Sequence, residues 1–329
     1  MQLSDFDYRL PKELIAQAPA RPRDHARLLV YDRLSGHITD DFFYNLDKYL
    51  VPGSSLVLND SKVEKTRLRI GNVEIFVVET VNPSTVRARV RPGKKFQLGS
   101  QISLPLKSGK LEVRTLDIDN EGIRTLQLGL PVGSPKLDDF RLTPFPPYIA
   151  QDESLAAEYQ TVYARPLGSR AAPTAGLHFT AAQLAKLSTT HPVVKLTLHV
   201  DLGTFAPVKN QDITSHKLHS EEFFVSAQAA KALNQAKHVT AVGTTSLRTL
   251  ESLKRPFKKT AGATDIFITP GYKFKNVDSL ITNFHLPKTT LLMLVAAFVG
   301  SGAELHRIYQ HAIDKKYRFY SFGDAMLVI

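Results

Sequence analysis

The sequence predicts a mixed α/β fold in which a small antiparallel β domain interrupts a larger α/β domain. The length of 329 residues suits about two domains. Residues 1–65 and 146–329 alternate apolar strand-like runs with amphipathic helical segments. Residues 66–145 instead contain short alternating segments separated by Gly, Pro and Asn turns. That pattern is typical of a small antiparallel barrel or sandwich.

The composition excludes several classes of protein. The chain is 43% hydrophobic, which is ordinary for a globular protein, and it has no cysteine. Disulfides, thiolate metal sites and cysteine nucleophiles are therefore excluded, and a reducing, cytoplasmic location is expected. The N-terminus has no signal-peptide pattern, and the longest apolar run, 291–299, is too short to span a bilayer. The net charge of +11 favours binding to a polyanion such as RNA or DNA. The alternative is a basic surface without such a partner.

In the first segment, strands are predicted over 27–31 and 56–58. Asp40 is predicted to cap a helix whose apolar face carries residues 42, 43, 46 and 50. Within 66–145, the alternating segments predict five strands. They cover residues 73–78, 86–90, 102–106, 111–116 and 123–128.

After residue 146 the mixed pattern returns. Strands are predicted over 193–200, 239–242, 265–269 and 280–283. Ser226 is expected to cap a helix to about residue 238, Thr289 or Thr290 a buried helix to about 299, and a last helix spans about 303–316.

The segment 168–180 is built almost wholly from small residues until it reaches Leu177, His178 and Phe179. Thr174 and Gly176 lie within it, and such a segment lets a ligand lie against the main chain. Thr180 and Gln183 predict a capping box at the start of the next helix. The alternative is a tight packing turn with a core histidine.

A second candidate segment, 243–246, is predicted as a turn between a strand and a helix. Gly243, Thr244, Thr245 and Ser246 offer amides and hydroxyls to a carboxylate, a ribose or a phosphate. The segment matches neither a Walker A loop nor a GxGxxG motif, and an ordinary N-cap is the alternative. Arg248, in the first turn of the predicted helix, could pair with a carboxylate.

Histidines occur at four predicted element ends: His178, His199, His219 and His285. Such positions suit proton transfer near neutral pH, although a single histidine is more often structural. No HExxH motif or cysteine pair is present, so no metal site is expected.

Three arginines share one face of the predicted strand 86–90 and its extension, because side chains alternate with a period of two. Arg87, Arg89 and Arg91, followed by Lys94 and Lys95, could track phosphates. The alternative is a solvated strand face.

These segments together resemble the S-adenosylmethionine:tRNA ribosyltransferase-isomerase family of queuosine biosynthesis. The most specific block is Ala171-Ala172-Pro173-Thr174-Ala175-Gly176-Leu177-His178-Phe179. The resemblance runs nearly end to end. Its other blocks are 15–17, 27–29, 58–61, 90–93, 146–149, 159–164, 197–200, 203–205, 242–246, 282–287, 317–320 and 323–326.

The resemblance implies a larger α/β domain, 1–65 with 146–329, and an inserted β-barrel, 66–145. It implies transfer and isomerisation of the ribosyl part of S-adenosylmethionine onto 7-aminomethyl-7-deazaguanine at the tRNA wobble position. Adenine and methionine would leave, and epoxyqueuosine would form. S-adenosylmethionine would be consumed as a substrate, so no cofactor is expected, and a cytoplasmic monomer without a membrane partner is expected.

The resemblance suggests roles for the candidate residues. His178 or His199 is expected as a general base, with the other or His285 protonating a leaving group. Residues expected to bind substrate are Thr174, Gly176, Gly243, Thr244, Thr245, Ser246, Arg248 and Asn283. Residues expected to bind RNA are Arg87, Arg89, Arg91, Lys94, Lys95 and Arg170.

The chain departs from the family pattern at several positions, among them Arg170 and Asp201. Two alternatives therefore stay open. One is a tRNA-binding relative without turnover, and the other is an enzyme that uses the nucleoside pocket on a different acceptor.

Overall fold

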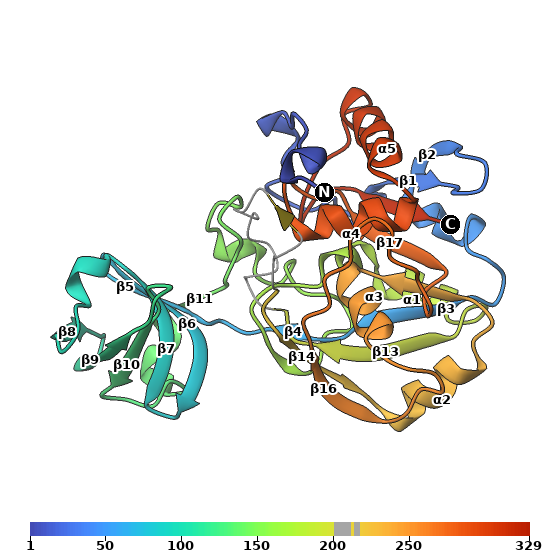
Figure 1. Ribbon diagram of the computed structural model, residues 1–329. Coiled ribbons are helices and arrows are strands. Elements are labelled where there is room, and N and C mark those ends of the chain that lie inside the picture. The colour runs from blue at the N-terminus through green and yellow to red at the C-terminus, as the bar shows by residue number, and fades with distance from the viewer. Residues whose placement is uncertain (201–211, 214–217) are drawn as a thin grey trace. The chain divides into compact units, whose positions relative to one another are not determined.

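The computed structural model describes residues 1–200, 212–213 and 218–329, and the chain divides into two compact units (Figure 1). The first unit comprises Met1–Val63 and Pro146–Ile329, and the second comprises Glu64–Phe145. The first unit contains both helices and strands, which confirms the predicted mixed α/β class.

A nine-stranded mixed sheet forms the centre of the first unit, in the order β16-β14-β13-β3-β15-β17-β18-β1-β2. Strands β13, β3, β15 and β17 are parallel neighbours, and β1 pairs in parallel with β18. The bounds are β1 Arg27–Tyr31, β2 Ile38–Phe42, β3 Ser55–Asn59, β13 Val193–Leu198, β14 Glu221–Val225, β15 Val239–Val242, β16 Thr260–Thr264, β17 Ser279–Asn283 and β18 Ala325–Val328. Two short strands, β4 Lys62–Val63 and β12 Leu167–Ser169, form a separate parallel pair.

This sheet is buried on both faces, because successive side chains of a strand point to opposite sides. In β1, Leu29 and Tyr31 join one apolar cluster, whereas Leu28 and Val30 join the other. Helices α2 (Ala227–Gln235), α3 (Thr244–Glu251), α4 (Thr290–Val299) and α5 (Gly302–Asp314) supply residues to the first cluster. The short turns η4 (Phe43–Lys48) and η8 (Thr174–His178) and helix α1 (Ala181–Leu187) supply the second.

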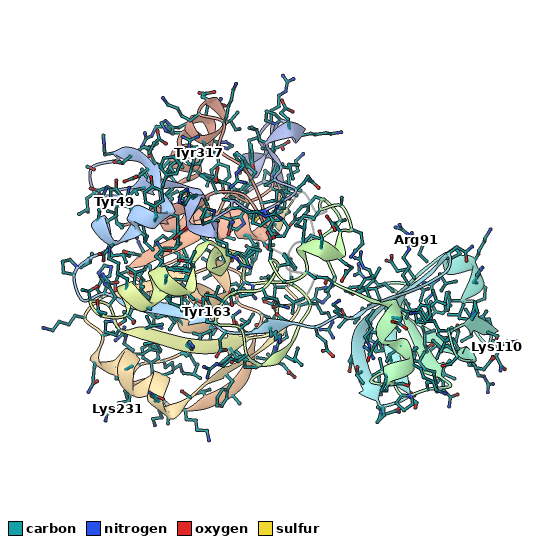
Figure 2. All side chains as sticks on the ribbon, turned by 180° about the vertical axis from the view of Figure 1, so that it is seen from behind. Tyr49, Arg91, Lys110, Tyr163, Lys231 and Tyr317 are labelled. Carbon is teal, nitrogen blue, oxygen red and sulfur yellow. The ribbon has the colours of Figure 1, made fainter. Side chains whose placement is uncertain are left out.

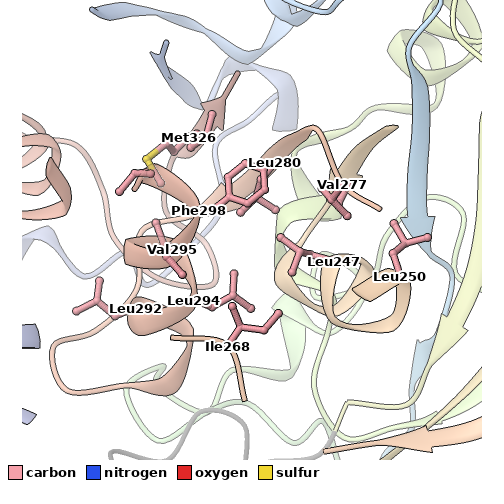
Figure 3. Close-up of a cluster of buried hydrophobic side chains, with 14 of the residues drawn as sticks. Leu247, Leu250, Ile268, Val277, Leu280, Leu292, Leu294, Val295, Phe298 and Met326 are labelled. Atoms are coloured by element: carbon pink, nitrogen blue, oxygen red, sulfur yellow. The ribbon is translucent and has the colours of Figure 1, made fainter. Parts of the chain in front are cut away.

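Helices α3 and α4 meet in the first cluster, which Figure 3 shows in part. Leu247 of α3 and Phe298 of α4 lie in it together with Leu280 of β17. Helix α4 is buried along its whole length. Phe284, which directly follows β17, belongs to the same cluster, so this packing reaches the carboxyl end of β17, from which the candidate site extends.

Predicted N-caps are found at three helices. The side chains of Thr180, Ser226 and Thr289 each accept a hydrogen bond from a backbone amide in the first turn of α1, α2 and α4. The second hydrogen bond of the predicted capping box, from the backbone N–H of Thr180 to the Gln183 side chain, is wrong. The Gln183 side chain instead donates to the carbonyl of Phe43. The side-chain amide of Gln183 therefore bonds to η4, a contact between distant segments, and not to the N-cap of its own helix.

The second unit is a seven-stranded sheet in the order β11-β5-β6-β7-β10-β9-β8, with antiparallel pairing throughout. It has its own apolar core. Each of the five strands predicted in this region overlaps an observed one. The bounds are β5 Arg67–Ile70, β6 Val73–Asn82, β7 Thr85–Arg91, β8 Gln101–Pro105, β9 Lys110–Ile118, β10 Arg124–Leu128 and β11 Arg141–Leu142.

The prediction of a helix capped by Asp40 is wrong. Asp40 lies in β2, which pairs with β1, and the only helical part is the short turn η4. Its carboxylate accepts a hydrogen bond from Tyr317. Pairing with a strand of the main sheet therefore outweighs the helical spacing of the apolar residues.

One further strand prediction is wrong, and one observed strand was missed. The strand predicted over 265–269 is absent, and β16 occupies Thr260–Thr264, where small residues pair along the edge of the sheet with β14. Strand β18 was not predicted.

Among the described helices, none by itself is long and apolar enough to cross a membrane; α4 and α5 meet that test only as a pair bent by 106°.

A glycine near the C-terminus allows the chain to fold back on itself. A Cβ atom at Gly323 would lie 2.5 Å from the carbonyl oxygen of Arg318, and backbone cannot shift cheaply. We predict that Gly323→Ala lowers the free energy of unfolding by roughly 1–3 kcal/mol. Urea denaturation measures this. Gly302→Ala is the control, because its Cβ would lie 3.9 Å from the nearest atom; equal stability of the two variants contradicts the prediction.

Candidate active site

The small-residue segment packs closely against other side chains. A Cβ at Gly176 would lie 2.0 Å from the hydroxyl of Tyr163, and one at Gly168 would lie 2.9 Å from the ring of His199. Gly168 also has φ 137°, which favours glycine. In this structure Gly176 leaves room for the side chain of Tyr163, and Gly168 leaves room for that of His199. Binding of a ligand at Gly176 stays a prediction.

Asn283, at the end of β17, joins His178 to the C-terminal segment. Its Nδ2 lies 3.2 Å from Nε2 of His178 and donates to the carbonyl oxygen of Tyr320 at 3.0 Å. Because an amide nitrogen can only donate, we assign Nε2 of His178 as the acceptor and place the ring proton on Nδ1. Burial lowers the pKa of His178 to about 3, with smaller contributions from Arg318 and Arg23. The ring is therefore neutral at pH 7.

His285 is the second buried, neutral histidine, and it lies two residues after Asn283. Its Nε2 is 2.9 Å from the hydroxyl of Thr282, and its backbone N–H donates to the hydroxyl of Tyr309 at 3.0 Å. The hydroxyl of Tyr8 donates to its carbonyl oxygen. Burial lowers the pKa of His285 to about 3. Backbone and ring are thus both held in place.

One cavity is bordered by three of the predicted residues, Thr174, Asn283 and His285. Tyr148, Tyr320 and Ser321 also line it, and sequence reasoning gave them no role. The hydroxyl of Tyr148 lies 2.8 Å from that of Ser321. For Tyr148 and Tyr320 the signal existed, since residues 146–149 and 317–320 belong to blocks that carry the family resemblance.

His199 borders a different groove. Its ring Nδ1 lies 2.9 Å from the hydroxyl of Ser61, and its backbone N–H donates to the carbonyl of Glu222. Thr197, Glu222 and Phe224 line the same groove, on strands β13 and β14. The structure therefore groups His178 with His285 through Asn283 and gives His199 other neighbours. His219 is exposed, and Asp201 lies outside the described residues.

The segment 243–246 begins helix α3 directly, so the predicted turn is wrong beyond its first residue. Gly243 has φ 90° and precedes the helix, and Thr244, Thr245 and Ser246 form the first turn. The hydroxyl of Ser246 donates to the carbonyl of Val242, and that of Thr245 accepts from Asn59. Both hydroxyls therefore have protein partners in this structure.

Arg248 is buried in an ion pair with Glu221, also buried. Its Nε donates to the carbonyl of Ile266 at 3.3 Å. Nη2 has no hydrogen-bond partner among the described residues, and the side chain lines a further cavity with Leu218 and Thr290. A ligand carboxylate would therefore have to use Nη2.

The basic residues of β7 alternate with buried Val86 and Ala88. Figure 2 marks Arg91 in this unit. Arg89 and Arg91 are exposed, whereas Arg87 is paired with both Glu79 and Asp119. Lys94 and Lys95 follow in a 3-10 turn, where Nζ of Lys95 donates to Asn72. Arg170 belongs to the other unit, where its N–H donates to the carbonyl of Val200.

The fold and the cavity define an α/β protein with a buried, neutral polar site at the end of a sheet strand, where small ligands bind in such folds. No group of three His, Asp or Glu residues that could hold a metal ion occurs among the described residues. The chain belongs to the family described as queuosine biosynthesis protein, whose sequence model matches residues 3–328.

Similar proteins cover the whole chain. It is 45% identical over 344 residues to the S-adenosylmethionine:tRNA ribosyltransferase-isomerase of Halothermothrix orenii, and 43% identical over 343 residues to that of Clostridioides difficile, with 100% of each chain covered. The crystal structure of S-adenosylmethionine tRNA ribosyltransferase from Thermotoga maritima matches with a TM-score of 0.57 and 35% identity. That match covers 99% of this chain and 100% of the other.

The two buried histidines make stability depend on pH. In the unfolded chain each takes up a proton below its ordinary pKa of 6.5, whereas the folded protein binds it only near pH 3. We predict that the free energy of unfolding falls as pH drops below 6.5, by about 1 kcal/mol per pH unit for each histidine. Urea denaturation at pH 7 and pH 5 measures this.

The double variant His178→Gln with His285→Gln is the comparison for that measurement. It should lose less stability between pH 7 and pH 5 than the unmodified chain, because it lacks the two titrating rings. An identical loss in both proteins contradicts the assignment of two neutral buried histidines.

Proposed function

We propose that this protein is an S-adenosylmethionine:tRNA ribosyltransferase-isomerase that acts in queuosine biosynthesis. The observation that carries the proposal is the full-length identity of 45% to a protein of that name. In this reaction the ribosyl part of S-adenosylmethionine is transferred to 7-aminomethyl-7-deazaguanine at the wobble position and isomerised. Adenine and methionine leave, and epoxyqueuosine remains on the tRNA.

The buried site supports this chemistry. The positive sulfur of S-adenosylmethionine acidifies the carbon beside it, so a nearby base can remove a proton and leave an ylide. A histidine that is neutral at pH 7 has the lone pair that this step requires. Nε2 of His178 already accepts from Asn283, so this contact must be given up before His178 can act as a base. His285 borders the cavity directly, and His199 stays a candidate in the separate groove that it lines.

Substrate roles follow from position. Thr174 and Asn283 border the same cavity as His285. Gly243 lies beside the small-residue segment, since a Cβ there would be 3.7 Å from that of Ala175. We propose that these residues, with Gly176 and the first turn of α3, hold ribose or methionine groups, and that Arg248 offers Nη2 to the methionine carboxylate. S-adenosylmethionine is consumed, so no cofactor is proposed.

We further propose that residues 66–145 form an inserted barrel-type domain that contacts tRNA. Its antiparallel strands, separate core and exposed Arg89 and Arg91 support this role. Lys94, Lys95 and, from the first unit, Arg170 complete the proposed RNA contacts. The absence of cysteine fits a cytoplasmic protein, and a monomer stays our expectation.

Release of adenine tests the proposed reaction. With tRNA that carries 7-aminomethyl-7-deazaguanine, we expect adenine to appear from S-adenosylmethionine. With guanine at the wobble base we expect none. His178→Ala and His285→Ala should each lower the rate by roughly 10²-fold or more, because general acid–base groups contribute that much. His37→Ala, at an exposed position, should keep the rate. Tight tRNA binding without release would favour the non-catalytic alternative.

Charge reversal on β7 tests the RNA face. We predict that Arg89→Glu with Arg91→Glu reduces the slope of log affinity against log salt by close to one unit for each lost phosphate contact. Arg87 is left unchanged, because it is tied to Glu79 and Asp119. Lys110→Glu, in β9 of the same unit, is the control and should keep the slope. An unchanged slope in the double variant would remove β7 from the RNA interface.

A further inference from the structure

Two buried oxygen atoms near the cavity have no partner in the part of the chain that the structure describes. The hydroxyl of Tyr320 and Oδ1 of Asn283 have no hydrogen-bond partner among the described residues, although both side chains are more than nine-tenths buried. The donation of Nδ2 of Asn283 to the Tyr320 carbonyl fixes which end of the amide carries the oxygen. Buried polar groups are normally paired, so these two oxygens indicate a site for a ligand.

The backbone at Tyr320 is held in an uncommon conformation. Its φ of 75° lies in the left-handed region, which a bulky side chain rarely adopts. Three hydrogen bonds maintain it: its N–H donates to the carbonyl of Phe284, and its carbonyl accepts from Asn283 and from Gly323. Such conformations cluster at ligand sites, where the surrounding structure over-determines them.

Aromatic rings form one side of the cavity. The ring centroids of Tyr148 and Tyr320 are 3.9 Å apart at 48°. Aromatic faces carry partial negative charge and attract cations. Among the described residues that line the cavity there is no Lys, Arg, Asp or Glu, and burial keeps His285 neutral at pH 7. A cation that enters therefore meets π faces and oxygen acceptors and no charged side chain among the described lining residues, while Arg318 and Arg23 act on His178 from outside this lining.

We propose that this cavity binds the sulfonium group of S-adenosylmethionine, with Tyr148 and Tyr320 as its aromatic wall and Oδ1 of Asn283 as an acceptor facing the positive centre. The inference rests on the proposed function, which brings a sulfonium to the protein. The cavity volume is about 10 Å³, which is room for about one water-sized group, so the cavity takes the methyl end of the sulfonium and leaves the rest of the ligand outside. Because His285 lines the same cavity, it becomes the histidine closest to the acidified carbon.

A pair of ligands isolates the sulfonium. S-adenosylhomocysteine lacks the methyl group and the positive charge at sulfur but keeps the adenosine, the ammonium and the carboxylate. We expect the unmodified protein to bind S-adenosylmethionine about 10-fold more tightly than S-adenosylhomocysteine, as cation–π attraction in a desolvated site allows. Equilibrium dialysis measures both constants, for the protein alone and with tRNA that carries guanine at the wobble base.

Three variants locate the preference. Tyr320→Leu and Tyr148→Leu remove a ring and should each bring the ratio of the two constants close to one. Tyr320→Phe keeps the ring and should retain most of the ratio. Tyr49→Phe is the control, because its hydroxyl is bonded to Asp41 and it lies outside the cavity lining. A merely structural defect would weaken both ligands equally and leave their ratio unchanged.

The outcomes separate the two proposals. A ratio near one in the unmodified protein, or a ratio that survives both leucine variants, overturns the sulfonium site and leaves the proposed reaction standing. Failure of S-adenosylmethionine to bind under either condition overturns both. Loss of the ratio in the leucine variants, with its retention in Tyr320→Phe and Tyr49→Phe, supports the assignment.

Discussion

The amide of Asn283 ties three distant parts of the chain together. Its nitrogen reaches the ring of His178, 105 residues away, and the carbonyl of Tyr320, 37 residues away. A single buried side chain therefore sets the tautomer of His178 and helps to hold the backbone of Tyr320 in its left-handed conformation. The strand β17 can support this role because the helices α3 and α4 pack over the sheet beside it.

The described polar groups of the site are uncharged, and this decides its chemistry. Burial keeps both His178 and His285 uncharged, while hydroxyl and carbonyl groups supply the hydrogen bonds around them. A low dielectric makes an unpaired polar atom costly and an ordered one effective. The oxygens of Asn283 and Tyr320 have no partner among the described residues, which fits a site that gains stability from a bound ligand.

The strands of the second unit follow from local patterns. Val86 and Ala88 alternate with Arg87 and Arg89, and turn residues mark the ends of each strand, so the period of two is sufficient. The basic face is less simple. Arg87 is occupied by two carboxylates from β6 and the segment after β9, a pairing that depends on strand register and cannot be read from β7 alone.

Other failures have the same origin. Asp40 joins a strand because β1 offers a pairing edge, and Ala261, Gly262 and Ala263 pair with β14 although their propensity for strands is low. Tyr148 and Tyr320 become neighbours only through the fold, although both lie in blocks that carry the family resemblance. Spacing along the sequence holds no information on which distant side chains share a cavity.

The sequence by itself determined the mixed α/β class, the change of character at residues 66–145, three of the helix caps and the family. Those features depend on local chemistry and on ordered blocks of residues. The tertiary structure alone decided that His178 and His285 are neutral, that Arg248 is paired with Glu221, and that Tyr320 faces a shared cavity. Each of these depends on burial and on contacts between residues far apart in the chain, which exist only once the sheet has formed.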